Sequence, residues 1–286
     1  MSNLRTVVRG MYDVQKIRVM MGNRIVANFK AKLGQEPSKS EDELDPEGKA
    51  ILADLRKSFA KITDGVTAYP KRKDFKGDEL ISDFTEFVLI AQYLTLEQQE
   101  QQHLKNLKAV LDDYPIFVRF LKDIKGIGPA MAGVIISEID ITKAKYPSSL
   151  WAYAGLDVAS DGRGRSRRTE HLIKRKYQNK EGEEAERNSI TFNPFLKTKL
   201  VGVLASSFLR AGDNKYSQIY RDYKNRLENR PDLAESSKAR RHNMALRYMI
   251  KMFLLDLYNV WRPIEGLPVA PPYQEAKLGH KHSRAA

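Results

Sequence analysis

Apolar residues recur every three or four positions along most of the chain, and short polar stretches interrupt this spacing. In residues 4–33, for example, Leu4, Val7, Met11 and Ile25 would share one face of a helix. The same spacing returns in five later segments, which are residues 51–62, 80–91, 95–111, 196–208 and 236–262. The pattern predicts a mainly α protein.

Two of the helical segments carry more specific signals. Thr95 followed by Gln98 has the spacing of a capping box, so we expect a new helix to begin at Thr95. Tyr216, Tyr220 and Tyr223 are spaced to share one helix face, which favours packing in the core. Because lysines and arginines are interleaved with these tyrosines, stacking on exposed bases is the alternative.

The polar stretches divide the chain into three regions. Gly34 ends the first helix, and residues 34–48, which are acidic and contain Pro and Ser, have the composition of a flexible linker. A second acidic stretch, residues 178–191, is typical of a turn between short strands and predicts a small irregular or β-hairpin insertion. We therefore expect helical hairpins or coiled coil that self-associate as a homo-oligomer at residues 1–113, a basic domain at 114–265 and a flexible tail at 266–286.

Residues 121–136 place a Gly-Ile-Gly-Pro turn between two apolar, helix-forming stretches, which is the arrangement of a helix-hairpin-helix DNA-binding element. The two glycines can adopt backbone angles that other residues avoid, and Pro129 fits the first turn of the following helix. Free amides at such a turn can bind a DNA phosphate without reading the base sequence. The candidate contacts are Lys122, Lys125, Gly126, Ile127 and Gly128. An ordinary tight connection between packed helices is the alternative.

The net charge of +13 lies entirely in the second part of the chain. Residues 1–113 contain 18 Lys and Arg and 18 Asp and Glu, whereas residues 114–286 contain 31 and 18. A localised excess of this kind is the electrostatic footprint expected of a protein that binds a polyanion. An anionic membrane is the rival partner, and we rank it lower because no basic amphipathic helix with exposed large apolar residues stands out.

The composition also excludes several kinds of site. The chain has no cysteine, which excludes disulfides, thiolate metal sites and cysteine nucleophiles. His280 and His282 fall in the tail and are more typical of a disordered end than of a metal site. No 18-residue apolar run and no signal-peptide pattern occur, so we expect a cytoplasmic, nucleoid-associated protein that does not span a membrane.

Two further groups of cations are candidates for contact with DNA phosphates. The first group lies in the glycine-containing segment 160–176 and consists of Arg163, Arg165, Arg167, Arg168, Lys174, Arg175 and Lys176. A solvated charged loop is the alternative for this segment. The second group is Lys238, Arg240 and Arg241 at the start of the last helix, where positive charge opposes the helix dipole and a phosphate is the natural partner.

Three motifs follow one another along the chain. They are the Gly-Ile-Gly-Pro turn, the Trp-Ala-Tyr-Ala-Gly-Leu segment at residues 151–156 and the Ser/Gly/Arg-rich loop that follows. Their order resembles the C-terminal transposase domain of the bridge-RNA-guided insertion-sequence transposases, over residues 95–262. The resemblance implies DNA as the partner, with RNA as a further one.

The resemblance also implies a candidate nucleophile. In that family a serine in a Ser-Gly-containing loop becomes joined covalently to the cleaved DNA phosphate, and the matching position here is Ser160. Family members also have an N-terminal ribonuclease-H-like domain, in which four acidic residues hold Mg²⁺. Residues 1–113 depart from that pattern because they read as helices and not as alternating strands. We therefore expect no metal site in this chain.

These observations lead to two hypotheses and a third class. The first is a transposase-derived protein that binds the backbone of duplex or branched DNA through the hairpin amides and the arginine-rich loop, with no cofactor. The alternative is a serine-dependent recombinase or transposase that forms a phosphoserine intermediate at Ser160, requires Mg²⁺ and is completed by a separate metal-binding subunit. An RNA-binding or architectural scaffold protein would share the basic surface.

Overall fold

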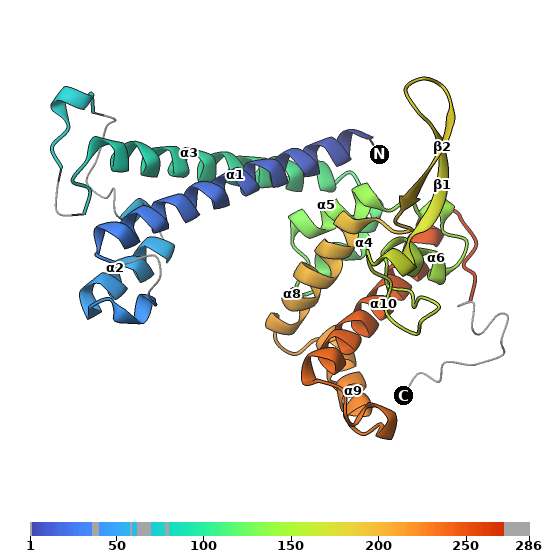
Figure 1. The fold of residues 1–286 in the computed structure, drawn as a ribbon. Helices are drawn as coiled ribbons and strands as arrows, with labels where there is room; N and C mark the ends of the chain where they lie inside the picture. The colour runs from blue at the N-terminus through green and yellow to red at the C-terminus, as the bar shows by residue number, and fades with distance from the viewer. Residues whose placement is uncertain (1, 36–39, 58, 62–69, 78–79, 272–286) are drawn as a thin grey trace. The chain divides into compact units, whose positions relative to one another are not determined.

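The computed structural model describes residues 2–35, 40–57, 59–61, 70–77 and 80–271, and it is mainly helical, as the apolar spacing predicts (Figure 1). The chain forms two compact units. The N-terminal unit consists of Thr6–Leu107, and the C-terminal unit consists of Met1–Arg5 together with Lys108–Ala286. Apolar side chains are buried within each unit.

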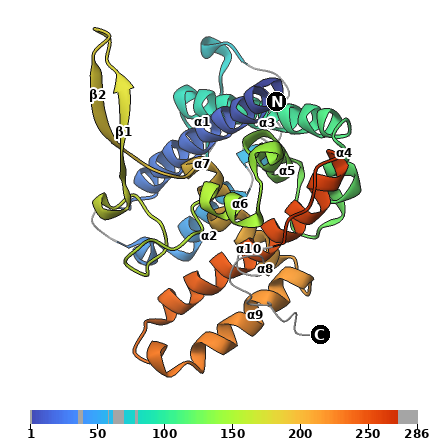
Figure 2. The ribbon, with the colours of Figure 1, turned by 90° about the vertical axis from the view of Figure 1, so that its right-hand side faces the viewer.

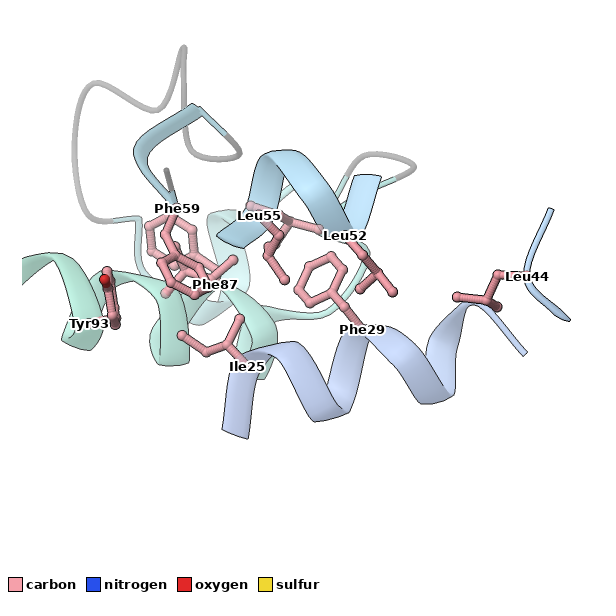
Figure 3. Close-up of a cluster of buried hydrophobic side chains, with 10 residues drawn as sticks. Ile25, Phe29, Leu44, Leu52, Leu55, Phe59, Phe87 and Tyr93 are labelled. Atoms are coloured by element: carbon pink, nitrogen blue, oxygen red, sulfur yellow. The ribbon is translucent and has the colours of Figure 1, made fainter. Parts of the chain in front are cut away.

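The N-terminal unit is built from three helices, α1 (Ser2–Lys32), α2 (Pro46–Lys57) and α3 (Phe84–Leu111). Short 3-10 turns lie between them, η1 (Glu41–Glu43), η2 (Phe59–Lys61) and η3 (Arg72–Asp74). Side chains from all three helices meet in one cluster, which includes Ile25, Phe29, Leu55 and Phe87 (Figure 3). The described part of this unit contains no strand, in agreement with the helical pattern of its sequence.

One polar residue explains an interruption in the apolar spacing of α1. The Arg18 side chain pairs with Glu100 of α3, and its guanidinium also donates a hydrogen bond of 2.8 Å to the hydroxyl of Tyr93. Arg18 therefore lies between two packed helices, where it satisfies a carboxylate and a phenol instead of facing solvent.

The predicted helix start at Thr95 is wrong, because α3 runs without a break from Phe84. The Thr95 hydroxyl donates to the carbonyl of Ala91 at 3.0 Å, a bond that a threonine can make inside a helix. The capping interactions occur twelve residues earlier, where Asp83 accepts from the amide of Thr85 at 3.1 Å and Glu86 accepts from the amide of Asp83 at 3.3 Å.

The expected linker and tail are in part ordered. Leu44 is buried and α2 begins at Pro46, whereas residues 36–39 lie outside the described residues. At the other end, the Ala270 amide donates to the hydroxyl of Tyr258 at 3.2 Å. Residues 272–286, which include the two tail histidines, also lie outside the described residues.

The C-terminal unit contains seven α-helices and one pair of strands within its described residues (Figure 2). The helices are α4 (Pro115–Arg119), α5 (Pro129–Glu138), α6 (Pro147–Tyr153), α7 (Pro194–Lys197), α8 (Ala205–Arg210), α9 (Lys215–Glu228) and α10 (Lys238–Ile264). A π-helical segment, η7 (Thr198–Leu204), joins α7 to α8. Shorter 3-10 turns are η4 (Leu121–Asp123), η5 (Ile141–Lys143), η6 (Thr169–His171) and η8 (Pro231–Leu233).

The long helix α10 supplies much of the core of this unit, and α9 packs along it (Figures 1 and 2). Phe253 of α10 lies against Phe208 and Tyr216, with ring centroids 5.6 and 5.5 Å away. Tyr216 and Tyr220 are buried, and Tyr223 stacks on Tyr248 at 3.9 Å. The prediction that the three tyrosines pack is therefore confirmed.

The predicted short strands form an antiparallel ribbon, β1 (Ile173–Gln178) and β2 (Glu184–Ser189). In its register Arg175 lies directly opposite Arg187, and Lys176 lies opposite Glu186. Every residue of β1 is exposed, and both views show the ribbon extending beyond the helices of its own unit (Figures 1 and 2). The small β-hairpin insertion expected from the sequence is confirmed.

Candidate nucleic-acid interface

The Gly-Ile-Gly-Pro turn connects η4 to α5, and its two glycines have different roles. Gly126 has a φ of +97°, which only glycine adopts without strain, whereas Gly128 has a φ of −95° that any residue can adopt. A Cβ on Gly126 would also lie 3.0 Å from Phe208 Cδ1, but a Cβ on Gly128 would meet no atom within 4 Å. The expectation of special backbone angles therefore holds for Gly126 and not for Gly128.

The turn leaves backbone amides available for a ligand. The Ile127 amide donates to the carbonyl of Ile124 at 3.0 Å, which closes the turn. Among the residues that the structure describes, no acceptor pairs with the amides of Gly126, Gly128 or Ala130. Amides at the first turn of a helix lack intrahelical partners and attract anions. Two exposed lysines, Lys122 and Lys125, precede these amides along the chain.

The arginine-rich loop folds back on itself as a tight hairpin between residues 157 and 165. Val158 and Gly164 form an antiparallel bridge, and the Gly162 amide donates to the carbonyl of Ala159 at 3.0 Å. The guanidinium of Arg165 makes two hydrogen bonds to one carboxylate oxygen of Asp157, at 3.0 and 2.8 Å. Arg165 therefore closes the loop, whereas Arg163, Arg167 and Arg168 are exposed.

The candidate nucleophile Ser160 lies at the exposed tip of this loop. Within the described residues its hydroxyl has no hydrogen-bond partner, and the nearby histidine contacts a different serine. The hydroxyl of Ser166 lies 2.8 Å from Nδ1 of His171, and Nε2 of His171 lies 3.2 Å from the carboxylate of Asp161. The backbone amide of Ser166 donates to the same Nδ1 at 3.0 Å.

These contacts define the proton positions on the imidazole of His171. Because Nδ1 accepts from the Ser166 amide, the ring proton belongs on Nε2, where it donates to Asp161. The bond from the Arg163 amide, followed by the bond from His171, lowers the pKa of Asp161 below its ordinary value. Ser166, His171 and Asp161 thus form a hydroxyl, base and carboxylate chain that the sequence pattern did not reveal.

Three cations of the helical core lie close to one another near the loop. We call these residues, Lys197, Arg247 and Lys251, the cation cluster. Arg247 of α10 donates to the carbonyls of Gly155 and Asp157, at 3.1 and 3.2 Å. Lys197 of α7 donates to the carbonyl of Arg165. These bonds attach the loop and the preceding Tyr-Ala-Gly-Leu segment to the helical core.

The charges of the cation cluster are poorly neutralised. Burial, together with repulsion from Arg247 and Arg167, lowers the pKa of Lys197 to about 8. Burial and the charge of Arg247 also lower the pKa of Lys251, whose ammonium lies 5.4 Å from the ring centre of Trp151. Asp157 is the carboxylate that acts on all three, and it is already bonded to Arg165. The cluster therefore has the electrostatic character of an anion-binding region.

The depressed pKa of Lys197 leads to a pH-dependent stability. Between about pH 8 and the ordinary lysine value of 10.5, the unfolded chain keeps a proton that the folded protein has released. Stability from this group therefore rises with pH across that window. We expect the free energy of unfolding of Lys197→Met, minus that of wild type, to decrease from pH 7.5 to pH 10 in urea titrations. A difference that does not change with pH would contradict the assignment.

The cations on the two faces of the ribbon differ in whether a carboxylate lies near them. On one face, Lys174 lies 3.9 Å from Glu186 and Lys176 lies 3.3 Å from Glu184. On the other face, Arg175 and Arg187 are neighbours, and no described carboxylate lies within ion-pair distance of either. The pairing register thus separates Arg175 from the two lysines that surround it in the sequence.

The three cations at the start of α10 also differ in their contacts. Arg241 donates to the carbonyls of Leu233 and Ser236, so it stabilises the turn that precedes the helix. Lys238 and Arg240 are exposed, and the Ser237 hydroxyl accepts from the Arg240 amide at 3.2 Å to cap the helix. Of the three cations, Lys238 and Arg240 are the ones with free side chains in the described part of the chain.

A metal-binding cluster and a membrane-spanning helix are both absent from the described residues. Among the described residues, no group of three His, Asp or Glu side chains is arranged to hold a metal ion. No described helix is both long and apolar enough to cross a membrane.

Comparison with known protein families gives a match within the C-terminal unit. Residues 118–180 match the model of the transposase family IS116/IS110/IS902. The matched segment contains the hairpin turn, the Tyr-Ala-Gly-Leu segment, the arginine-rich loop and β1. No curated protein matches the chain. Over this segment, the chain is similar to transposases of the IS116/IS110/IS902 family.

Proposed function

We propose that the C-terminal unit binds DNA through the phosphates of its backbone, in a transposase-derived role. The observation that carries the proposal is the turn at Gly126, where the amides of Gly126, Gly128 and Ala130 have no acceptor among the described residues. The exposed Lys122 and Lys125 add two positive charges next to these amides. Such a site binds phosphate groups without base contacts.

The match to a transposase family supports DNA as the polyanion, and the charge distribution supports the same choice. Exposed arginines of the loop and exposed cations of α10, namely Arg163, Arg167, Arg168, Lys238 and Arg240, would add phosphate contacts. Because such binding releases counterions, its affinity falls steeply as the salt concentration rises.

The experiment that tests the proposal uses the difference between the two glycines. Gly128→Val should weaken binding of the full chain to duplex DNA by about tenfold, because the new side chain covers the free amides and prevents approach of a phosphate. The fold should survive, since a Cβ at Gly128 meets no atom within 4 Å. Fluorescence anisotropy at several salt concentrations measures the affinity, and circular dichroism monitors the fold.

Gly202→Val is the matched control, because Gly202 is also exposed and has open space at its Cβ position. It should bind like wild type. Lys122→Ala with Lys125→Ala should reduce the salt slope by about two, one for each lost phosphate contact. Equal affinity of Gly128→Val and wild type at every salt concentration would overturn the role of the hairpin.

A second candidate function is favoured by the Ser166, His171 and Asp161 chain. The hydroxyl of Ser166 lies 2.8 Å from Nδ1 of His171, an unprotonated imidazole nitrogen that also accepts from the Ser166 amide. We infer a serine-dependent strand transfer in which Ser166, and not Ser160, attacks the phosphodiester. The P–O bond to one strand end breaks as the Ser166 Oγ–P bond forms. The proton passes to Nδ1 of His171 and then to the leaving oxygen.

A further inference from the structure

The β1–β2 ribbon has one neutralised face and one charged face. Lys174 and Lys176 face Glu186 and Glu184, so the two positive charges of that face are balanced by two negative charges. Pairs of this kind are ordinary for an exposed ribbon and contribute little to stability. We call this side the lysine–glutamate face.

The opposite side, which we call the arginine face, carries Arg175, Tyr177 and Arg187. Arg175 and Arg187 are directly opposite in the register, and like charges at such positions destabilise the pair. Within the described residues no carboxylate compensates them. The guanidinium of Arg187 lies 5.1 Å from the ring centre of Tyr177, which holds the side chain over the sheet. The arrangement costs stability in the free protein, and an anion would remove that cost.

The arginine face continues onto the loop. Arg167, Arg175 and Arg187 line one open groove together with Asn188 and Ser189. Arg167 also acts electrostatically on Lys197 of the cation cluster. Three exposed arginines from the loop and from both strands thus border a single groove.

We propose that the arginine face of the ribbon binds the backbone of duplex DNA, and that the lysine–glutamate face faces solvent. This inference rests on the proposed function and adds to it the ribbon, its orientation and Arg187. Guanidinium groups form paired hydrogen bonds with phosphates, and a two-stranded ribbon fits the major groove. A single strand is disfavoured because it requires aromatic stacking platforms, and the Tyr177 ring is occupied by Arg187.

Two double variants that remove equal charge test the proposal. Arg175→Ala with Arg187→Ala should weaken binding of the full chain to duplex DNA at least tenfold and reduce the salt slope by about two. Lys174→Ala with Lys176→Ala changes the net charge by the same amount on the other face. It should change the affinity less than threefold. Binding is measured by fluorescence anisotropy between about 50 and 200 mM salt, a range over which affinity that depends on phosphate contacts falls strongly.

The outcomes separate this proposal from the proposed function. Equal losses of affinity in the two double variants would show a nonspecific charge effect and would overturn the proposed orientation of the ribbon. In that case, DNA binding by wild type and weaker binding by Gly128→Val would still support phosphate binding at the Gly-Ile-Gly-Pro turn. No binding of duplex DNA by wild type would overturn both. Tighter competition by single-stranded DNA or by RNA than by duplex DNA would overturn the choice of a duplex.

Discussion

Replacing Phe208 by alanine should lower the free energy of unfolding of the C-terminal unit by about 3–5 kcal/mol, the usual cost of removing a buried phenyl ring. Phe208 is fully buried and stacks on Tyr216, with ring centroids 4.6 Å apart. It also contacts Phe253 of α10 and lies beside Gly126 of the hairpin turn. The variant therefore leaves a cavity where three segments of the unit meet.

Urea denaturation followed by circular dichroism measures this effect. Phe195→Ala, which removes a ring that is only partly buried, is the matched control and should cost less than half as much. The same Phe208→Ala protein should bind DNA more weakly, because the ring supports the backbone at Gly126. A loss of stability close to that of the control would mean that the packing around the turn does not depend on Phe208.

Ser166→Ala should abolish any covalent complex between the chain and DNA, whereas Ser160→Ala should retain it. The reason is that His171 contacts the hydroxyl of Ser166, while Ser160 is exposed and its hydroxyl has no hydrogen-bonded base among the described residues. Conversion of His171 to Asn should slow formation of the adduct by about 10²–10⁴-fold, the usual contribution of a general base.

Supercoiled DNA is incubated with the full chain, with and without Mg²⁺, and adducts are resolved on a denaturing gel. The two serine variants are well matched, since each removes one hydroxyl from the same loop. An adduct that persists in Ser166→Ala but disappears in Ser160→Ala would identify Ser160 as the nucleophile, as the family resemblance implies. Absence of an adduct with wild type under all conditions would leave DNA binding as the activity of the chain.

The helical architecture could be predicted because a helix repeats its buried face every three or four residues. That regularity is local, so Leu4, Met11 and Ile25 reveal it without knowledge of their partners. The start of α3 was missed because Thr95 with Gln98 and Asp83 with Glu86 have the same spacing, and spacing alone does not tell which pair caps the helix.

The candidate site depends on contacts that no local pattern contains. Arg187 was not identified because the register of the ribbon, and not the sequence around it, brings it opposite Arg175. Lys197 and Arg247 lie fifty residues apart in sequence, so their mutual repulsion is visible only in the fold. In the hairpin, the sequence correctly indicated that glycine is needed, but only the backbone angles distinguish Gly126 from Gly128.

The alternation of faces along the ribbon has a consequence for how such a surface can change during evolution. Successive residues of a strand point to opposite sides, so a shift of one position exchanges the two sides completely. A single inserted residue in β2 would turn Arg187 toward the lysines and bring a glutamate beside Arg175, although every charged residue would still be present. The separation of the two faces therefore depends on the spacing of the residues in each strand. Insertions should be far less tolerated in the ribbon than substitutions.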